Sequence, residues 1–210
     1  MNYSLAINSR VALSKSASLS RPAYSLGKQI AAAGHTALTP AGLSLAYQVA
    51  RGAADKSGLS IGFSPAAGLR QHVNSLQLPT DVYDWLHFTG LGPSALLAEL
   101  IQKSQALVLV GAVMANISEL ALASDASLPV GVLLDSEEQA NNDLLQYLQS
   151  LPLEKQRHIV VHKDPKTLLD TVAKMLDEAY ADLDQPALEQ NNQFFGKLLK
   201  EVADVPEPAD

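Results

Sequence analysis

The segment from Gly111 to Glu119 combines a glycine turn, an amide and a carboxylate directly after an apolar stretch. Residues 106–110 read ALVLV and predict a strand that is covered on both faces. A helix is expected to begin near Asn116, where unpaired backbone N–H groups can bind an anion. Asn116 and Glu119 also have the spacing of a capping box, which needs no ligand. The segment therefore predicts either a binding site or a capped helix start.

Two further turns at predicted strand ends carry glycine and hydroxyl residues. In the first turn, Gly42 is followed by Ser44, which can contact a phosphate or cap the next helix. In the second, Gly90 and Gly92 allow a ligand close to the backbone, and Thr89 offers a hydroxyl. The alternative for the second turn is a tight connection to the following helix.

Positive charge is expected from the loop after the first strand, which contains Arg10, although such a loop is more often simply solvated. The 15 Lys and Arg residues are scattered, and the formal net charge is −7. A nucleic-acid partner is therefore not expected. The chain has no cysteine, which excludes disulfides, thiolate metal sites and a cysteine nucleophile. No metal site is predicted.

Strands and helices must alternate to bring these turns to one edge of a sheet. Strands are predicted at 3–8, 35–39, 59–63, 85–88, 106–110, 130–134 and 158–162. Residues 9–22 are predicted to be a loop. Helices are predicted at 23–33, 42–56, 93–104, 116–126, 137–150 and 166–183. This alternation favours an α/β, Rossmann-like three-layer αβα fold with a mostly parallel sheet. Ligands bind such sheets in the crevice beyond the carboxyl ends of the strands.

The length of 210 residues and the apolar content of 47% favour one domain over residues 1–183. The tail, residues 184–210, contains an amphipathic stretch around Phe194 and Phe195, which can dock on its own domain or contact a second subunit. The longest apolar run is shorter than the ~20 residues that a bilayer crossing needs. No secretory signal is recognised, so a cytoplasmic protein without a membrane partner is expected.

The order of the turns and helices resembles the Lonely-Guy and lysine-decarboxylase-like (SLOG) superfamily over roughly residues 3–180. The matching features are the LxxAxxxARGA helix, the TGLG loop and the SELALA helix. The superfamily includes putative molybdenum cofactor carrier proteins and cytokinin-activating nucleotide phosphoribohydrolases. The resemblance implies a modified Rossmann fold, a homodimer and a nucleotide or other phosphorylated ligand.

The superfamily motif P-G-G-x-G-T-x-x-E aligns here with its final residue on Glu119. Gly111 stands at the motif proline, Ala115 replaces the third glycine, and Asn116 replaces the threonine. The resemblance implies a catalytic role for Glu119 and ligand contacts for the other three residues. Leu96 stands where the hydrolases carry a catalytic arginine. The loss of that fixed cation removes a group that stabilises developing charge.

Three functions remain open from the sequence. The first is a binding protein of the cofactor-carrier-like class for a nucleotide or another phosphorylated small molecule, without hydrolase activity and with no other cofactor assigned. The second is a nucleoside 5′-monophosphate phosphoribohydrolase that uses Glu119, with Arg10 or Arg70 as the cation. The third is a non-catalytic interaction scaffold.

Overall fold

The described part of the chain forms one seven-stranded sheet in which neighbouring strands pair in parallel. The computed structural model describes residues 1–12, 17–111, 113–135 and 143–181. The strands are β1 (Ser4–Asn8), β2 (Thr36–Pro40), β3 (Ser60–Ser64), β4 (Trp85–Phe88), β5 (Ala106–Val110), β6 (Val130–Leu133) and β7 (Ile159–His162). Their order across the sheet is β4-β3-β2-β1-β5-β6-β7. The predicted α/β fold is confirmed.

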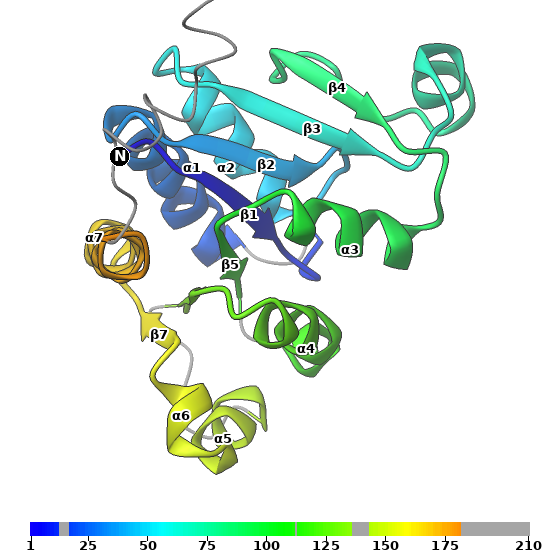
Figure 1. The fold of residues 1–210 in the computed structure, drawn as a ribbon. Helices are drawn as coiled ribbons and strands as arrows, with labels where there is room; N and C mark the ends of the chain where they lie inside the picture. Colours follow the sequence, from blue (N-terminus) through cyan, green and yellow to red (C-terminus); the bar gives the residue numbers. More distant parts are fainter. Residues whose placement is uncertain (13–16, 112, 136–142, 182–210) are drawn as a thin grey trace, which may run out of the picture. The chain divides into compact units, whose positions relative to one another are not determined.

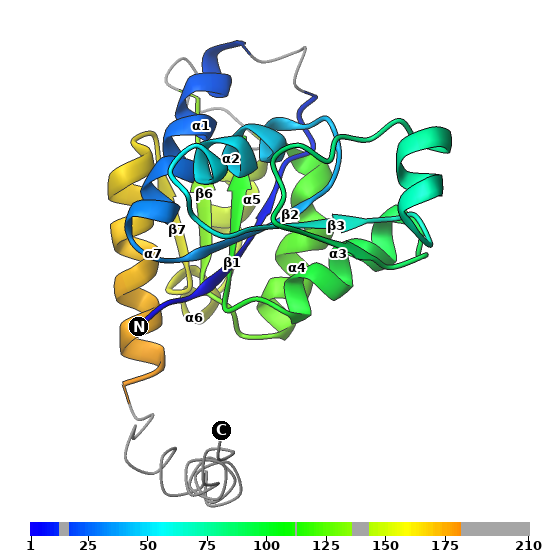
Figure 2. The same cartoon turned by 90° about the horizontal axis from the view of Figure 1, so that it is seen from above.

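Helices cover both faces of this sheet, as a three-layer fold requires (Figure 1, Figure 2). The helices are α1 (Ala17–Ala32), α2 (Leu45–Ala54), α3 (Pro93–Gln102), α4 (Ile117–Asp125), α5 (Asp143–Ser150), α6 (Leu153–Gln156) and α7 (Pro165–Ala179). One core cluster packs α3, α4 and α5 against one face of the sheet. On the other face lie α1, α2 and α7. The strand β5 is buried at every position, because both layers cover it.

The helix α1 begins at Ala17, so the predicted helix start at residue 23 was wrong and the predicted loop over residues 9–22 was too long at its end. Leu19, Ala23, Leu26 and Ile30 are buried at helical spacing along its inner face. Pro22 lies inside the helix. Its missing N–H removes one hydrogen bond near the helix start, and the burial of Leu19 offsets that loss.

The helices α1 and α2 pack closely because each has a glycine at the point of contact. A Cβ atom on Gly27 would overlap the backbone carbonyl of Val49, and one on Gly52 would overlap that of Tyr24. Neither position therefore has room for a side chain. This contact fixes how α2, and with it the turn before α2, lies against the sheet.

Residues Met1–Leu176 form one compact unit, and a second unit begins at Asp177. The predicted domain boundary at residues 183–184 and the predicted tail helix lie outside the described residues, as does the first part of the helix expected at 137–150. None of the helices that the structure describes has the length and hydropathy needed to cross a membrane.

Candidate functional site

The order of the strands places a switch point between β1 and β5. The chain runs outward from β1 through β2 and β3 to β4, and then returns to β5 on the other side of β1. Crossovers on the two sides of such a point diverge, which leaves a crevice beyond the carboxyl ends of the strands. Residues 9–12 after β1 and the segment from Gly111 after β5 lie at these ends. The site is therefore sought there.

A carboxylate joins the two sides of the switch point. Glu119, in the first turn of α4, is fully buried. Its Oε1 accepts hydrogen bonds from Asn8 Nδ2 at 2.9 Å and from Arg10 Nε at 2.6 Å. Its Oε2 accepts from Ser118 Oγ at 2.9 Å. Ser9 Oγ adds a second link by donating to the carbonyl oxygen of Val110 at 2.7 Å.

The expected capping box is absent from the start of α4. The side chain of Asn116 makes no capping hydrogen bond, and Glu119 bonds to β1 and its following loop instead. Asn116 is fully buried, and no described residue hydrogen-bonds its side-chain oxygen or nitrogen. The geometry therefore does not support the interpretation of this segment as an ordinary capped helix start.

A cleft with a volume of about 400 Å³ opens beside Arg10. Its walls come from the loop after β1, the turn between β2 and α2, and the first turns of α3. The two loops are tied together, since Ala12 and Ser44 form an antiparallel bridge and Leu45 N donates to Val11 O at 3.3 Å. Among the described residues that line the cleft, Arg10 alone carries a charge.

Three of the predicted ligand-binding residues, Arg10, Gly42 and Ser44, line this cleft together. Ser44 is also the N-cap of α2, because its side chain accepts a hydrogen bond from Ala46 N. Both interpretations of Ser44 are therefore compatible with its position. Leu43 lines the cleft but is 59% exposed, so it does not plug it.

The remaining residues that were predicted to bind the ligand, and the predicted catalytic residue Glu119, lie outside the lining of the cleft. The predicted ligand-binding residues outside it are Thr89, Gly90, Gly92, Gly111, Ala115 and Asn116. Thr89 Oγ1 donates to Ser64 O at 2.9 Å and so holds its own loop in place. Gly111 has a φ of +85°, a conformation that favours glycine. It therefore has a structural reason to be glycine, independent of any ligand.

Apolar side chains form much of the cleft wall, and they were not singled out from the sequence. They include Phe63, Leu78, Leu96 and Leu97. Leu96, at the position of the family's arginine, is 4% exposed and faces this cleft. Nearby, burial raises the pKa of Tyr83 far above its usual range, so its phenol stays protonated beside the cleft residue Pro40. These residues come from separate segments of the chain, so their proximity can be predicted only once the strand order is known.

A model of the SLOG cluster4 family matches residues 10–169. The chain belongs to the SLOG cluster4 family. The superfamily expected from the sequence is thereby confirmed. The match extends from Arg10, in the loop after β1, into α7, and so includes most of the cleft lining and the segment of Glu119. No curated protein matches this SLOG cluster4 protein.

Solved structures share the fold of this SLOG cluster4 protein. The molybdenum cofactor binding protein of Rippkaea orientalis has 22% sequence identity and a TM-score of 0.67, covering 84% of this chain and 98% of that chain. The molybdenum cofactor carrier protein of Chlamydomonas reinhardtii has 24% sequence identity and a TM-score of 0.62, covering 82% of this chain and 97% of that chain. DNA processing protein A of Helicobacter pylori, described for its single-stranded DNA binding mode, has 14% identity and a TM-score of 0.56, covering 81% and 80%. At these identities the likeness shows a common fold.

Proposed function

We propose that this SLOG cluster4 protein binds a phosphorylated small molecule of the nucleotide or cofactor type in the cleft beside Arg10. The observation that carries the proposal is the placement of one fixed guanidinium at the mouth of a largely apolar cleft. In this proposal the protein is a binding or carrier protein and not a hydrolase.

The guanidinium of Arg10 supports the binding of a phosphate. Its Nε is engaged by Glu119, and no described residue accepts a hydrogen bond from its two terminal nitrogens. The side chain is 36% exposed, so those nitrogens can reach solvent and a ligand. Two N–H groups on a planar fork match two phosphate oxygens. Glu119 fixes the orientation of the Arg10 guanidinium, which lowers the conformational entropy lost on ligand binding.

The turn before α2 supports a second contact to the same group. A Cβ atom on Gly42 would meet no atom within 4 Å, so the backbone there is open to a ligand. The helix α2 begins at Leu45, three residues after Gly42. The N–H groups of Leu45 and Ala46 bond to Val11 O and Ser44 Oγ, so α2 contributes the positive end of its dipole, which favours an anion. The apolar wall around Phe63 and Leu96 suits the ring system of a nucleotide or of a cofactor.

The position of Glu119 supports binding without hydrolysis. The carboxylate is fully buried and accepts three hydrogen bonds from within the protein. A general acid or base must come within hydrogen-bond reach of the reacting group. We assign Glu119 the role of positioning Arg10. The solved structures with the same fold that are described as molybdenum cofactor proteins also favour a carrier function.

A thermal-shift screen tests the proposal directly. The probes are nucleoside monophosphates, sugar phosphates and pterin-type cofactors, with inorganic phosphate as a reference. A ligand at about a hundred times its dissociation constant adds ~2.7 kcal/mol to the free energy of unfolding. Arg10→Met should weaken binding of the best probe at least ~10-fold, since one charged hydrogen-bonded contact is worth 1.5–3 kcal/mol, roughly.

Arg70→Met is the matched control, because Arg70 is exposed and lies outside the lining of the cleft. An equal loss of binding in both variants would contradict the role of Arg10. The absence of a shift with every probe would favour the interaction scaffold. Release of a free base from the bound nucleotide, abolished by Glu119→Gln, would establish the hydrolase alternative. Binding of an oligothymidylate probe would overturn the expectation of no nucleic-acid partner.

A further inference from the structure

A second pocket lies at the opposite edge of the sheet, near the amino ends of β6 and β7. Its volume is about 290 Å³, and α4, α5 and α6 contribute to its walls. Leu120, Val130, Leu151 and Ile159 provide apolar surface inside it. This volume is at the lower limit of ~300 Å³ for small-molecule sites. None of its lining residues also lines the cleft beside Arg10.

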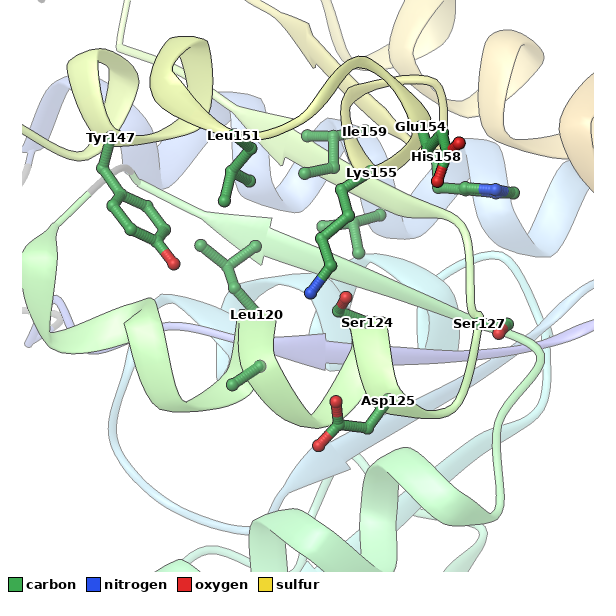
Figure 3. A pocket seen from close by; sticks show the side chains of 12 residues that line it. Leu120, Ser124, Asp125, Ser127, Tyr147, Leu151, Glu154, Lys155, His158 and Ile159 are labelled. Carbon is green, nitrogen blue, oxygen red and sulfur yellow. The ribbon is translucent and has the colours of Figure 1, made fainter.

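Three polar groups from three helices point into this pocket. Figure 3 shows the ammonium group of Lys155 and the hydroxyl of Ser124 directed to the same part of the pocket, and the hydroxyl of Tyr147 directed inward from α5. No described residue makes a hydrogen bond or ion pair with these three groups. Lys155 and Ser124 together offer one positive charge and one hydroxyl donor to a bound group.

The charges around the pocket restrict the ligand. Asp125, Glu154 and His158 also belong to its lining, and Figure 3 shows the carboxylate of Asp125 apart from the ammonium group of Lys155. The two carboxylates repel a multiply charged anion such as phosphate more strongly than a singly charged one. A group with a single negative charge can pair with Lys155 while its remaining atoms contact the apolar side chains.

We propose that this pocket binds a small monocarboxylic acid with an apolar body. The carboxylate accepts hydrogen bonds from Lys155 and Ser124, and the hydrocarbon part packs on Leu120 and Ile159. The site is independent of the function proposed for the cleft, because the two sets of lining residues do not overlap.

Titration calorimetry with the full chain tests this site, with hexanoate and phenylacetate as probes. The neutral analogue 1-hexanol and inorganic phosphate serve as comparison ligands. Lys155→Met keeps the length of the side chain and removes the charge, and it should weaken hexanoate binding at least ~10-fold. Ser124→Ala should weaken binding by a smaller factor. Hexanol should bind the native protein no better than hexanoate binds Lys155→Met.

Two variants control for effects elsewhere in the chain. Lys56→Met removes an exposed lysine outside both pockets and should leave hexanoate binding unchanged. Lys103→Met removes another exposed lysine outside both pockets and should also leave it unchanged. Native affinity in Lys155→Met, or an equal loss in Lys56→Met, would overturn the proposal. Binding of hexylamine in preference to hexanoate would overturn it too, because the site would then select a cation.

Discussion

Glu119 connects the two halves of the sheet through a single carboxylate. Asn8 and Arg10 come from the first strand and its loop, whereas Glu119 lies more than a hundred positions later in the chain. Its carboxylate is withdrawn from solvent, and it is satisfied because donors from both sides surround it. One buried group thereby both stabilises the fold and orients the cation of the cleft.

Replacement of Glu119 by alanine should lower the free energy of unfolding by ~2–4 kcal/mol. The buried amide of Asn8 loses its acceptor, and Arg10 loses its counter-charge. Urea unfolding followed by circular dichroism measures the change. Glu154→Ala is the control, since that carboxylate is exposed and surface substitutions usually stay within ~0.5 kcal/mol. Equal stability of Glu119→Ala and the native protein would show that the buried pair contributes nothing.

The sequence predicted Glu119 and Arg10 as separate candidates but not their contact. The family motif identifies the glutamate, and the loop after the first strand identifies the arginine. No local pattern in the sequence reports which side chains meet across the switch point, so Asn8 was missed. The apolar residues around Phe63 and Leu96 were missed for a different reason. Apolar residues in a core and in a binding cleft follow the same sequence pattern.

At the scale of elements, the contact between α1 and α2 is the most sensitive to substitution. Gly27→Ala should lower the free energy of unfolding by ~2–3 kcal/mol, because the new methyl group overlaps the backbone of α2. Gly68→Ala is the matched control, since a Cβ atom there meets nothing within 4 Å. Thermal unfolding of the two variants measures the difference. Similar melting temperatures of the two variants would show that α1 and α2 can move apart to accommodate the methyl group without a loss of stability.

The start of α7 should make a small, pH-dependent contribution to stability. Asp164 Oδ1 accepts hydrogen bonds from Thr167 N at 2.8 Å and Thr167 Oγ1 at 2.7 Å, which lower the pKa of Asp164 below its ordinary value of 3.8. A lowered pKa in the folded state means that this contribution is complete above pH 3.8 and is lost as the pH falls through the folded-state pKa.

Asp164→Asn tests this contribution, because asparagine can cap a helix without titrating. The difference in melting temperature between the native protein and Asp164→Asn should stay constant near neutral pH. This difference in melting temperature should shift in favour of Asp164→Asn as the pH falls below the ordinary pKa of an aspartate, which is 3.8. A difference that does not change with pH would contradict the role of Asp164.

Helices and strands with a clear pattern of apolar residues were predicted at the right place in the sequence, but their first and last residues were predicted less accurately. The strands β1 and β5 lie where their apolar runs placed them, because such runs are buried from both faces. The start of α1 was misplaced at residue 23, directly after Pro22, whereas Pro22 lies inside the helix. The buried contacts of Leu19 stabilise the helical turn that precedes Pro22. The short helix α6 has too few residues to show a period.

At the scale of the whole molecule, the described core is contained in residues Met1–Leu176. A chain ending at residue 183 should therefore fold and melt within ~4 °C of the full protein, about the effect of 1 kcal/mol. Differential scanning calorimetry measures this. A larger decrease would show that the tail contributes to the core. Light scattering on both proteins tests the expected homodimer, and a monomer formed only after truncation would assign the association to the tail.

The central place of β1 determines when the proposed binding cleft is completed during synthesis. The half of the sheet from β1 to β4 is complete once residue 88 has left the ribosome, but the other edge of β1 pairs with residues 106–109. At ~5–20 residues per second the nascent chain exposes an unpaired strand edge for a second or more. Arg10 gains its counter-charge only when Glu119 has emerged. The proposed cleft therefore gains an oriented cation only after both half-sheets have joined.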